Sequence, residues 1–263
     1  MKYHWLFLLP LSSMLVFLTL PLAAIFLKVL PREGIWEALW HPLVTEALRL
    51  SVLTSLCSLC VAFLFGTPIA YFLARRRSRG AVLLDTLIDL PMVLPPTVAG
   101  VALLMAFGRR GVLGAWLDVV GVHISFTPVA VVLAQSFVGA PFYIRAARAG
   151  FQSVDQELER VAYTLGHSTF STFMRVTVPL ASPALLGGAV MAWARALGEF
   201  GATIMFAGNM SGRTQTMPLA IYTAMESDLT AALVLSSLLV LVSFGVLLVV
   251  RLLLHRSPFG VYA

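Results

Sequence analysis

Residues 153–183, SVDQELERVAYTLGHSTFSTFMRVTVPLASP, form the only sizeable polar, helix-forming block among the long apolar runs of this chain. Ser153 and Gln156 fit a capping box, in which the Ser hydroxyl and the Gln amide bond the free backbone amides at a helix start. A helix is therefore predicted to begin here. Gly166 is well placed to end that helix, because glycine readily adopts the left-handed backbone found at helix C-termini.

The predicted helix has one narrow apolar face. Apolar residues recur at positions i, i+3, i+4 and i+7, namely Leu158, Val161, Ala162 and Leu165. Other faces are acidic, with three carboxylates in five residues at Asp155, Glu157 and Glu159. An amphipathic helix could lie on the lipid surface, but the anionic inner leaflet attracts Lys and Arg rather than acids. The pattern therefore favours contact with a partner protein.

Composition places the rest of the chain in a membrane. Of the 263 residues, 59% are hydrophobic and 11% are charged, and the mean hydropathy is +0.92. This is too little charge to cover a soluble globule and enough apolar length for several membrane spans. The net charge of +6 is attributed to cytoplasmic loops, where Lys and Arg set topology. The lipid bilayer is the expected partner, and no nucleic acid is expected.

The apolar runs predict an all-α polytopic membrane protein in which residues 1–263 form a single transmembrane domain. Six transmembrane helices are expected, over residues 5–27, 47–73, 82–107, 128–147, 180–206 and 229–254. The first is interpreted as a retained helix, because its apolar run exceeds a signal-peptide core and no small-residue cleavage site closes it. Residues 151–179 form the loop between the fourth and fifth helices.

Six spans place both termini on one side of the membrane, and the basic residues indicate which side. With the termini inside, eleven Lys and Arg residues fall on the inner side and six on the outer side. Since basic residues are enriched in cytoplasmic loops, both termini and residues 151–179 are expected in the cytoplasm. The inner set includes the cluster Arg75, Arg76, Arg77 and Arg79, which is interpreted as a topology signal.

The sequence shows no catalytic or metal-binding constellation. Cys57 and Cys60 form a C-x-x-C pair inside an expected span, but no further Cys or His completes a metal site, so both are interpreted as buried packing residues. The only lysines are Lys2 and Lys28, and neither follows a glycine, which excludes the G-K-[ST] end of a phosphate-binding loop. An intramembrane enzyme would need a nucleophile with a base. If ATP drives this protein, another chain must bind it.

The third expected span contains three prolines within residues 90–100, LPMVLPPTVAG. Each proline removes a backbone donor and obstructs the preceding helical turn. Such backbone is tolerated at membrane depth only against protein or a water-filled cavity. The stretch is therefore either a pore wall or a packed kink, and its candidate residues are Pro95, Pro96, Thr97 and Gly100.

The fifth expected span carries Arg195 and Glu199, whose i, i+4 spacing lets them pair on one helical face. Charges in a bilayer are costly and generally pair or face an aqueous path. Arg195 therefore either contacts a passing anion or locks helices together through Glu199. The lock is the favoured interpretation, because a paired Arg has little electric field left for a substrate.

The polar block resembles the cytoplasmic loop of ABC importer permeases, whose pattern is Glu-Ala-Ala, three residues, Gly, nine residues, Ile, one residue, Leu-Pro. Gly166 matches its Gly and Val176 its Ile. The family's Glu falls on Arg160, so the acid of this chain stands one place early, about 100° away around the helix. The resemblance implies a type I ABC importer permease fold and a coupling helix that docks on a separate ATPase. The coupling residues that it implies are Glu159, Arg160, Val161, Ala162, Leu165 and Gly166.

Further stretches narrow the resemblance. RALGEFGAT at residues 195–203, GRTQTMPLAIY at residues 212–222 and the proline-rich third span are similar to those of molybdate permeases in the molybdate, tungstate and sulfate group. The resemblance implies a non-catalytic homodimer in the bacterial cytoplasmic membrane and an extracytoplasmic oxyanion-binding protein. Two ATPase subunits would bind ATP and Mg²⁺, so that no cofactor is expected on this chain. Molybdate, tungstate, sulfate and thiosulfate all stay open as substrates. An ion-coupled secondary transporter is a further alternative, although no internal repeat supports it.

Overall fold

The computed structural model describes residues 4–31, 35, 40–76 and 78–256, and within them the chain is helical and has no strand. The all-α prediction is thereby confirmed. The helices are α1 (His4–Val29), α3 (Pro42–Arg75), α4 (Arg79–Val93), α5 (Pro96–Phe107), α6 (Gly114–Val119), α7 (Pro128–Ser153), α8 (Gln156–Thr164), α9 (Thr169–Thr172), the π-helix η1 (Phe173–Thr177), α10 (Val178–Leu197), α11 (Gly201–Ala207), α12 (Met217–Ser227) and α13 (Leu229–Arg256).

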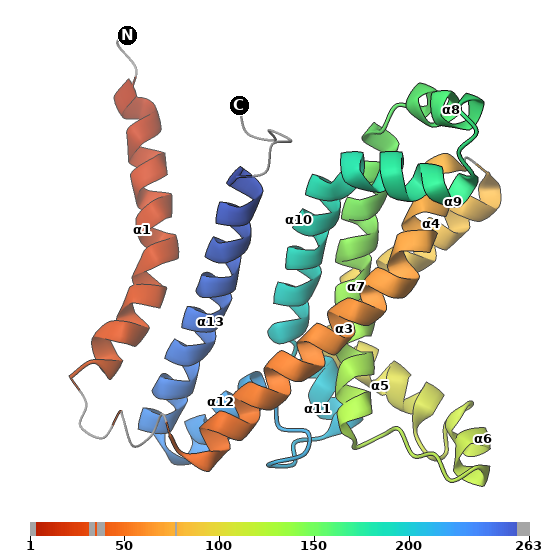
Figure 1. Ribbon diagram of the computed structural model, residues 1–263. Helices are drawn as coiled ribbons and strands as arrows, with labels where there is room; N and C mark the ends of the chain where they lie inside the picture. The colour runs from red at the N-terminus through yellow and green to blue at the C-terminus, as the bar shows by residue number, and fades with distance from the viewer. Residues whose placement is uncertain (1–3, 32–34, 36–39, 77, 257–263) are drawn as a thin grey trace.

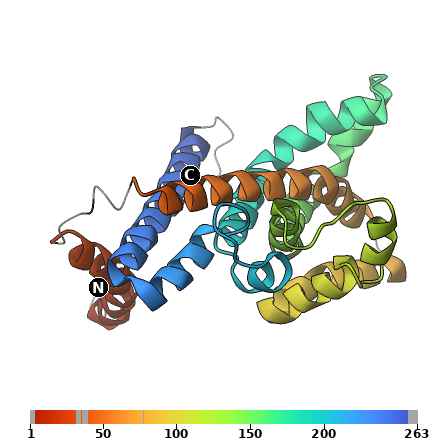
Figure 2. The ribbon, with the colours of Figure 1, turned by 90° about the horizontal axis from the view of Figure 1, so that it is seen from below.

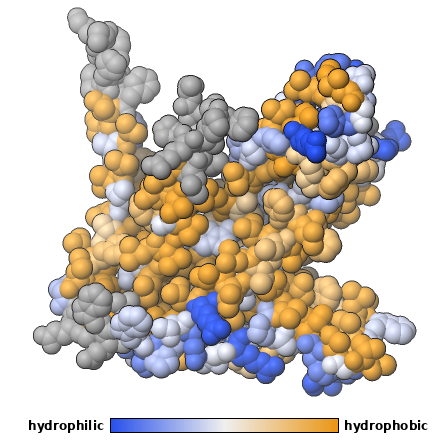
Figure 3. Space-filling view, in the orientation of Figure 1, coloured by the Kyte–Doolittle hydropathy of each residue, from blue (hydrophilic) through white to orange (hydrophobic). Residues whose placement is uncertain are grey.

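The long helices share two ends. α8 lies at one end, at the top of Figure 1, together with the start of α1 and the end of α13. Shorter helices, α5, α6, α11 and α12, lie toward the opposite end. Apolar side chains cover the middle of the surface in Figure 3, and polar ones gather toward the two ends. This is the distribution expected of a protein whose middle lies in lipid.

The described residues contain five helices that are long and apolar enough to cross a membrane, or six spans if α4 and α5 count together. The span expected over residues 82–107 consists of two helices, because α4 and α5 meet at a bend of 116° in the proline-rich stretch. Leu94 takes an extended backbone (φ −66°, ψ 137°). Pro95 and Pro96 then offer no amide to continue the α4 hydrogen-bond ladder.

The expected helix over residues 180–206 is also divided. α10 ends at Leu197, and α11 starts at Gly201 after a short break. The Glu199 carboxylate accepts a hydrogen bond from the Ala202 amide (Oε1 to N, 2.9 Å). This satisfies an amide that a helix start leaves free, so α11 begins anew instead of continuing α10. Among the other bounds the largest differences are at α3, which begins already at Pro42, and at α7, which continues to Ser153.

Both α3 and α10 pack along α7 and form the centre of the bundle. Small residues allow this approach, since a Cβ on Gly188 of α10 would lie only 2.6 Å from the Ala146 Cβ of α7. Polar side chains pair within the packing, as between the hydroxyls of Thr67 and Tyr143, 2.6 Å apart. Helices in lipid associate through such small residues and hydrogen bonds.

The prediction that Cys57 and Cys60 are buried is wrong, because both are exposed on α3. The buried face of α3 instead carries Ser55, Ser58 and Ala62. Ser58 bonds Ser136 of α7 (Oγ to Oγ, 3.2 Å). Polar side chains of α3 thus turn inward, where they have partners, and the thiols turn outward.

Seen from the end opposite α8, the bundle divides into two groups (Figure 2). α5, α7 and α11 lie together on one side, whereas α1, α12 and α13 lie on the other. The contact between α5 and α11 is close, because a Cβ on Gly100 would lie 2.8 Å from the Ala202 carbonyl oxygen. The two breaks in the chain therefore bring the two short helices α5 and α11 into close contact.

Gly100→Ala is expected to lower the free energy of unfolding by roughly 1–3 kcal/mol, because the added methyl group must push the α11 backbone away. Gly187→Ala is the matched control, since a Cβ there meets nothing within 4 Å, and this helix position favours Ala over Gly. Thermal unfolding of the detergent-solubilised protein compares the two variants. Equal midpoints would contradict the close α5–α11 packing.

Candidate coupling helix and membrane-embedded breaks

α8 is set off from α7 by a short extended connection. The predicted capping box is wrong in its residues, because Ser153 is the last residue of α7 and its Oγ donates to the Gly150 carbonyl (2.8 Å). Val154 is buried with an extended backbone, which interrupts the helix. Asp155 therefore caps α8, its Oδ1 accepting from the Glu157 amide (2.9 Å). A carboxylate at this position also suits the positive end of the helix dipole.

The predicted helix stop at Gly166 is confirmed. Gly166 has a φ of +87°, a conformation that glycine adopts without steric cost. Its amide donates to the Tyr163 carbonyl (3.0 Å), and the His167 amide donates to the Ala162 carbonyl (3.1 Å). These two bonds form a Schellman motif, which satisfies the carbonyls at the helix end. Both ends of α8 are thus fixed by local sequence.

The two faces of α8 have opposite surroundings. Ala162 and Glu159 are buried, and Glu159 is only 7% exposed. Leu158, Val161 and Leu165 are exposed, with Leu165 at 75%. We call these three residues the apolar stripe of α8. An apolar stripe left in contact with water indicates a surface that another protein covers.

The predicted coupling residues therefore do not share one surface. Val161, Leu165 and Arg160 face outward, and Arg160 pairs with Glu157 on its own helix (Nη1 to Oε1, 2.6 Å). Ala162 and Glu159 face this chain's own helices. Gly166 shapes the helix end. Glu159 is thus placed to hold α8, whereas the apolar stripe is placed to meet a partner.

The Glu159 carboxylate joins three segments that are far apart in the sequence. Its Oε1 lies 2.6 Å from Nη2 of Arg75, at the end of α3, and accepts a hydrogen bond from Oγ1 of Thr177 (2.7 Å), at the end of η1. Arg75 also reaches the Val154 carbonyl (Nη1 to O, 3.4 Å). We call Arg75, Glu159 and Thr177 the α8 anchor. A buried charge pair of this kind is strongly destabilised when either partner is removed.

Aromatic packing surrounds the α8 anchor. The rings of Tyr71, Phe151 and Phe173 lie with centroids 5.0–5.8 Å apart, from α3, α7 and η1. The guanidinium of Arg75 lies 5.7 Å from the Tyr71 ring centroid. Ring contacts and a cation over an aromatic face both add stability beyond buried area. Because η1 is a π-helix between α9 and α10, this packing lies at an irregularity of a kind often found at functional sites.

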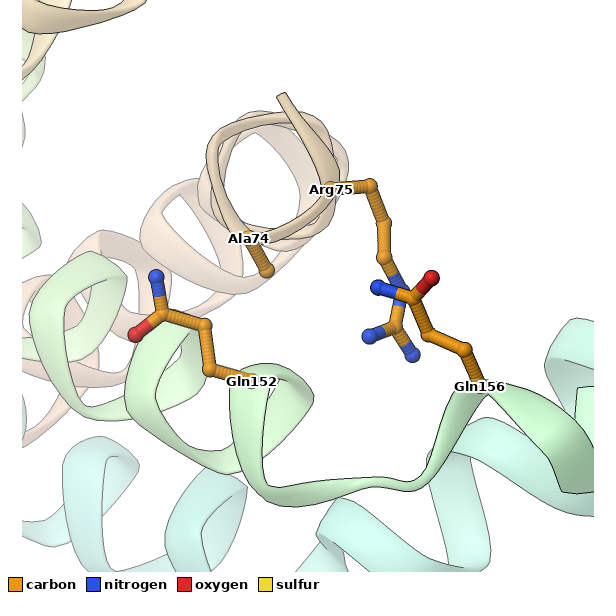
Figure 4. A pocket seen from close by; sticks show the side chains of 4 residues that line it. All are labelled: Ala74, Arg75, Gln152 and Gln156. Carbon is orange, nitrogen blue, oxygen red and sulfur yellow. The ribbon is translucent and has the colours of Figure 1, made fainter. Parts of the chain in front are cut away.

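A cavity of about 450 Å³ opens beside the α8 anchor, lined by Ala74, Arg75, Gln152 and Gln156. Figure 4 shows the Arg75 side chain extending from the end of α3 toward Gln156 of α8, with Gln152 of α7 across from it. The start of α8 is therefore not packed tightly against α3. The Arg75 side chain crosses the space between α3 and α8, so its charge pair with Glu159 connects the two helices directly.

The contact between Arg75 and Glu159 was not predicted from the sequence, in which Arg75 is part of a cluster interpreted as a topology signal. Arg75 and Glu159 are 84 residues apart, and no local spacing joins them. One signal could have suggested the contact. Arg75 ends an expected span on the side of the membrane where the acidic polar block begins, so the opposite charges of Arg75 and this block could pair. The neighbouring residues Arg76 and Arg79 are exposed and fit the topology interpretation.

The membrane-embedded candidates divide between exposed and buried positions. Pro95, Pro96 and Thr97 are exposed at the bend between α4 and α5, whereas Gly100 is buried. Gly201 of α11 packs on this segment, since a Cβ there would lie 2.7 Å from the Pro96 Cβ. The structure thus brings the proline-rich stretch next to the segment that follows Glu199. Whether this region lines a pore stays a prediction.

Arg195 and Glu199 pair as their spacing predicted, with Nη1 and Oε2 2.6 Å apart. Glu199 is 1% exposed, and its other oxygen caps α11 through the Ala202 amide. One carboxylate therefore connects the end of α10 to the start of α11, an arrangement that suits the lock interpretation. The described residues contain no group of three or more His, Cys, Asp and Glu side chains able to hold a metal ion.

The described residues contain five or six candidate membrane spans and, at one end of the bundle, a short helix with an uncovered apolar stripe, an architecture that suits a membrane permease with a partner protein. The comparison with known families agrees. The family described as "Binding-protein-dependent transport system inner membrane component" matches residues 66–257. The chain belongs to this family of ABC transporter permease subunits in the inner membrane.

Individual relatives cover nearly the whole chain. It is 44% identical over 258 residues to the molybdenum transport system permease protein ModB of Mycobacterium tuberculosis, covering 98% of this chain and 96% of that protein. It is 33% identical over 261 residues to the sulfate transport system permease protein CysT of Escherichia coli, covering 97% and 94%. A crystal structure of a bacterial ABC transporter involved in alginate import has the same fold, with a TM-score of 0.75, 17% identity and coverage of 98% and 97%.

Arg75→Gln is expected to loosen α8, because it leaves the buried Glu159 carboxylate without its counter-charge, at a cost of roughly 3–5 kcal/mol for a buried pair. Hydrogen exchange of the α8 amides measures the effect. Arg160→Gln is the matched control, since it breaks an exposed pair worth only about 0.2–0.5 kcal/mol. Similar exchange rates in both variants would show that the α8 anchor does not hold the helix.

Proposed function

We propose that this chain is the membrane-spanning permease subunit of an ATP-driven importer for molybdate or a related tetrahedral oxyanion. The observation that carries the proposal is the 44% identity over nearly the full chain to a permease named for molybdenum transport. A relative named for sulfate transport matches at the lower identity of 33%. Molybdate is therefore the preferred substrate, and tungstate and sulfate are the competing ones.

The partner at α8 is a separate ATPase subunit. The apolar stripe of α8 supports this, because it is exposed at the end of the bundle where α1 starts and α13 ends. The chain's two lysines exclude a phosphate-binding loop of its own, so ATP and Mg²⁺ belong to that ATPase and no cofactor to this chain. This end of the bundle then lies in the cytoplasm, with both termini.

The complete transporter contains two copies of this chain, two ATPase subunits and an extracytoplasmic binding protein. A second copy is supported by the exposed bend at Pro95, Pro96 and Thr97, because broken backbone at membrane depth needs protein or a water-filled cavity against it. The binding protein meets the loops at the end opposite α8, near residues 108–126 and 207–228. It sets most of the selectivity, since the permease must bind the ion weakly enough to release it.

The mechanism is alternating access driven by the ATPase. Closure of the ATPase dimer moves the two α8 helices. The α8 anchor passes this motion to α3 through Arg75 and to α10 through Thr177 and η1, because a buried charge pair keeps the three segments together. α10 ends at the Arg195–Glu199 pair, which connects it to α11 and, through close glycine contacts, to α5. The motion thereby reaches the bend between α4 and α5, which borders the proposed translocation path of the oxyanion.

Cells that lack this chain are expected to lose most of their molybdenum when grown on limiting molybdate with excess sulfate. Elemental analysis of cells with and without the chain measures this, with tungstate as a competitor in the wild type. Uptake blocked by tungstate and not by sulfate supports the proposal. Unchanged molybdenum together with reduced sulfate uptake would move the substrate to sulfate.

Leu165→Asp is expected to weaken ATPase binding by roughly 10- to 100-fold, about 1.4–3 kcal/mol, because it places a charge within an apolar contact. Co-purification of the ATPase with the tagged permease measures the loss. Ser168→Asp is the matched control, since it adds the same charge at the exposed N-cap of α9, a position where Asp also caps a helix. Equal recovery of the ATPase with both variants would rule out the apolar stripe as the contact surface.

A further inference from the structure

α4 is joined to α7 by two ion pairs that the sequence analysis did not single out. Asp85 lies in contact with Nη1 of Arg148, and Asp89 Oδ1 lies 3.2 Å from Nε of Arg145. Within each helix the charges are one turn apart, on the same face. We call these four residues the charged edge. Apart from it, α4 is loosely held, with Ala81 its only buried residue.

The charged edge lies within the α8 end of α7, a helix that is long and apolar enough over Pro128–Ser153 to cross a membrane. Arg148 and Arg145 precede the end of α7, Ser153, by five and eight residues, which places them about 8 and 12 Å along the axis from that end. Ionised side chains at such depth are rare in lipid, and they face protein or a water-filled cavity. The charged edge therefore does not face hydrocarbon.

The charged edge is open, unlike the other charge pair at membrane depth. Arg145 is 60% exposed and Asp89 27% at the side chain, whereas in the other pair Arg195 is 29% exposed and Glu199 only 1%. Within the described chain, the ion pair of Arg145 runs through Nε, which leaves its two Nη groups available to a ligand. A guanidinium presents a planar fork of donors that matches the oxygens of a tetrahedral anion.

The opposite side of α4 is apolar. Leu83 and Leu87 are exposed there, roughly half a turn around the helix from Asp85 and Asp89. α4 thus separates an apolar surface, suited to lipid, from a charged edge, suited to water. The charged edge also runs toward the exposed bend at Pro95 and Pro96. This bend needs a polar or protein environment as well, because broken backbone inside a membrane must have protein or water against it.

We propose that the charged edge lines the aqueous half of the path on the α8 side, and that Arg145 and Arg148 form a transient binding site for a tetrahedral oxyanion. The anion takes the place of Asp89 and Asp85 on the two guanidinium groups as it passes. Competition from these carboxylates keeps its affinity low, as release requires. Only the identity of the anion rests on the proposed function.

The test uses the permease–ATPase complex in inside-out vesicles, with Cys57 and Cys60 replaced by Ser. Asp89→Cys and Leu87→Cys are labelled with a charged, membrane-impermeant thiol reagent. We expect Asp89→Cys to react at least tenfold faster, and millimolar molybdate to slow its labelling at least threefold while chloride at equal ionic strength does not. Equal rates at the two positions would overturn the aqueous path, and fast labelling that no oxyanion slows would overturn the anion site.

The outcome separates this inference from the proposed function. Slowing by sulfate and not by molybdate would support the anion site while showing that the proposed substrate is wrong. A second pair of variants covers the case in which Asp89→Cys fails to assemble. Uptake by Arg145→Gln is expected to fall at least tenfold, with partial recovery in Arg145→Lys, which keeps the charge. Wild-type uptake by Arg145→Gln would overturn the site.

Discussion

The arrangement of the α8 end depends on one buried carboxylate. Glu159 bonds Arg75 and Thr177 at once, and so connects the end of α3, α8 and the π-helix that leads into α10. A carboxylate removed from water is costly unless it is paired and hydrogen-bonded, so these segments must keep their positions together. A purely apolar contact would tolerate sliding between the helices. The charge pair fixes both the distance and the direction of the contact.

The inward position of Glu159 decides what α8 presents outward. Glu159 and its neighbour on the helix surface, Ala162, are buried against the bundle. Leu158, Val161 and Leu165 lie about 100° or more around the helix from Glu159, and all three are exposed. The Asp155 cap and the Schellman motif at Gly166 end α8 at both sides, which keeps it short and separate from α7 and α9. Its uncovered stripe is thus a consequence of its own anchor.

Local sequence patterns predicted many features of the helix arrangement. Apolar length predicted the helices that cross the membrane, Gly166 predicted the end of α8, and the i, i+4 spacing predicted the Arg195–Glu199 pair. The predictions were wrong or incomplete where the position of a residue depends on a contact with a residue far away in the sequence. Glu159 could not be placed without Arg75, and the bend before Pro95 depends on packing against α11 as well as on proline. Ser153 lost its capping role because the burial of Val154 shifted the helix start to Asp155.

The charge pairs at membrane depth differ in how completely protein surrounds them, and this difference separates their roles. Glu199 is enclosed and uses its second oxygen to cap α11, so any loss of Arg195 would leave a buried charge without its partner. Arg145 and Asp89 are open on one side, so water can solvate either charge, and an anion can replace Asp89 on Arg145, at small cost. An enclosed pair suits an element that must move as a unit. An open pair suits a surface past which an ion must move, because its partners can exchange without leaving a charge unpaired.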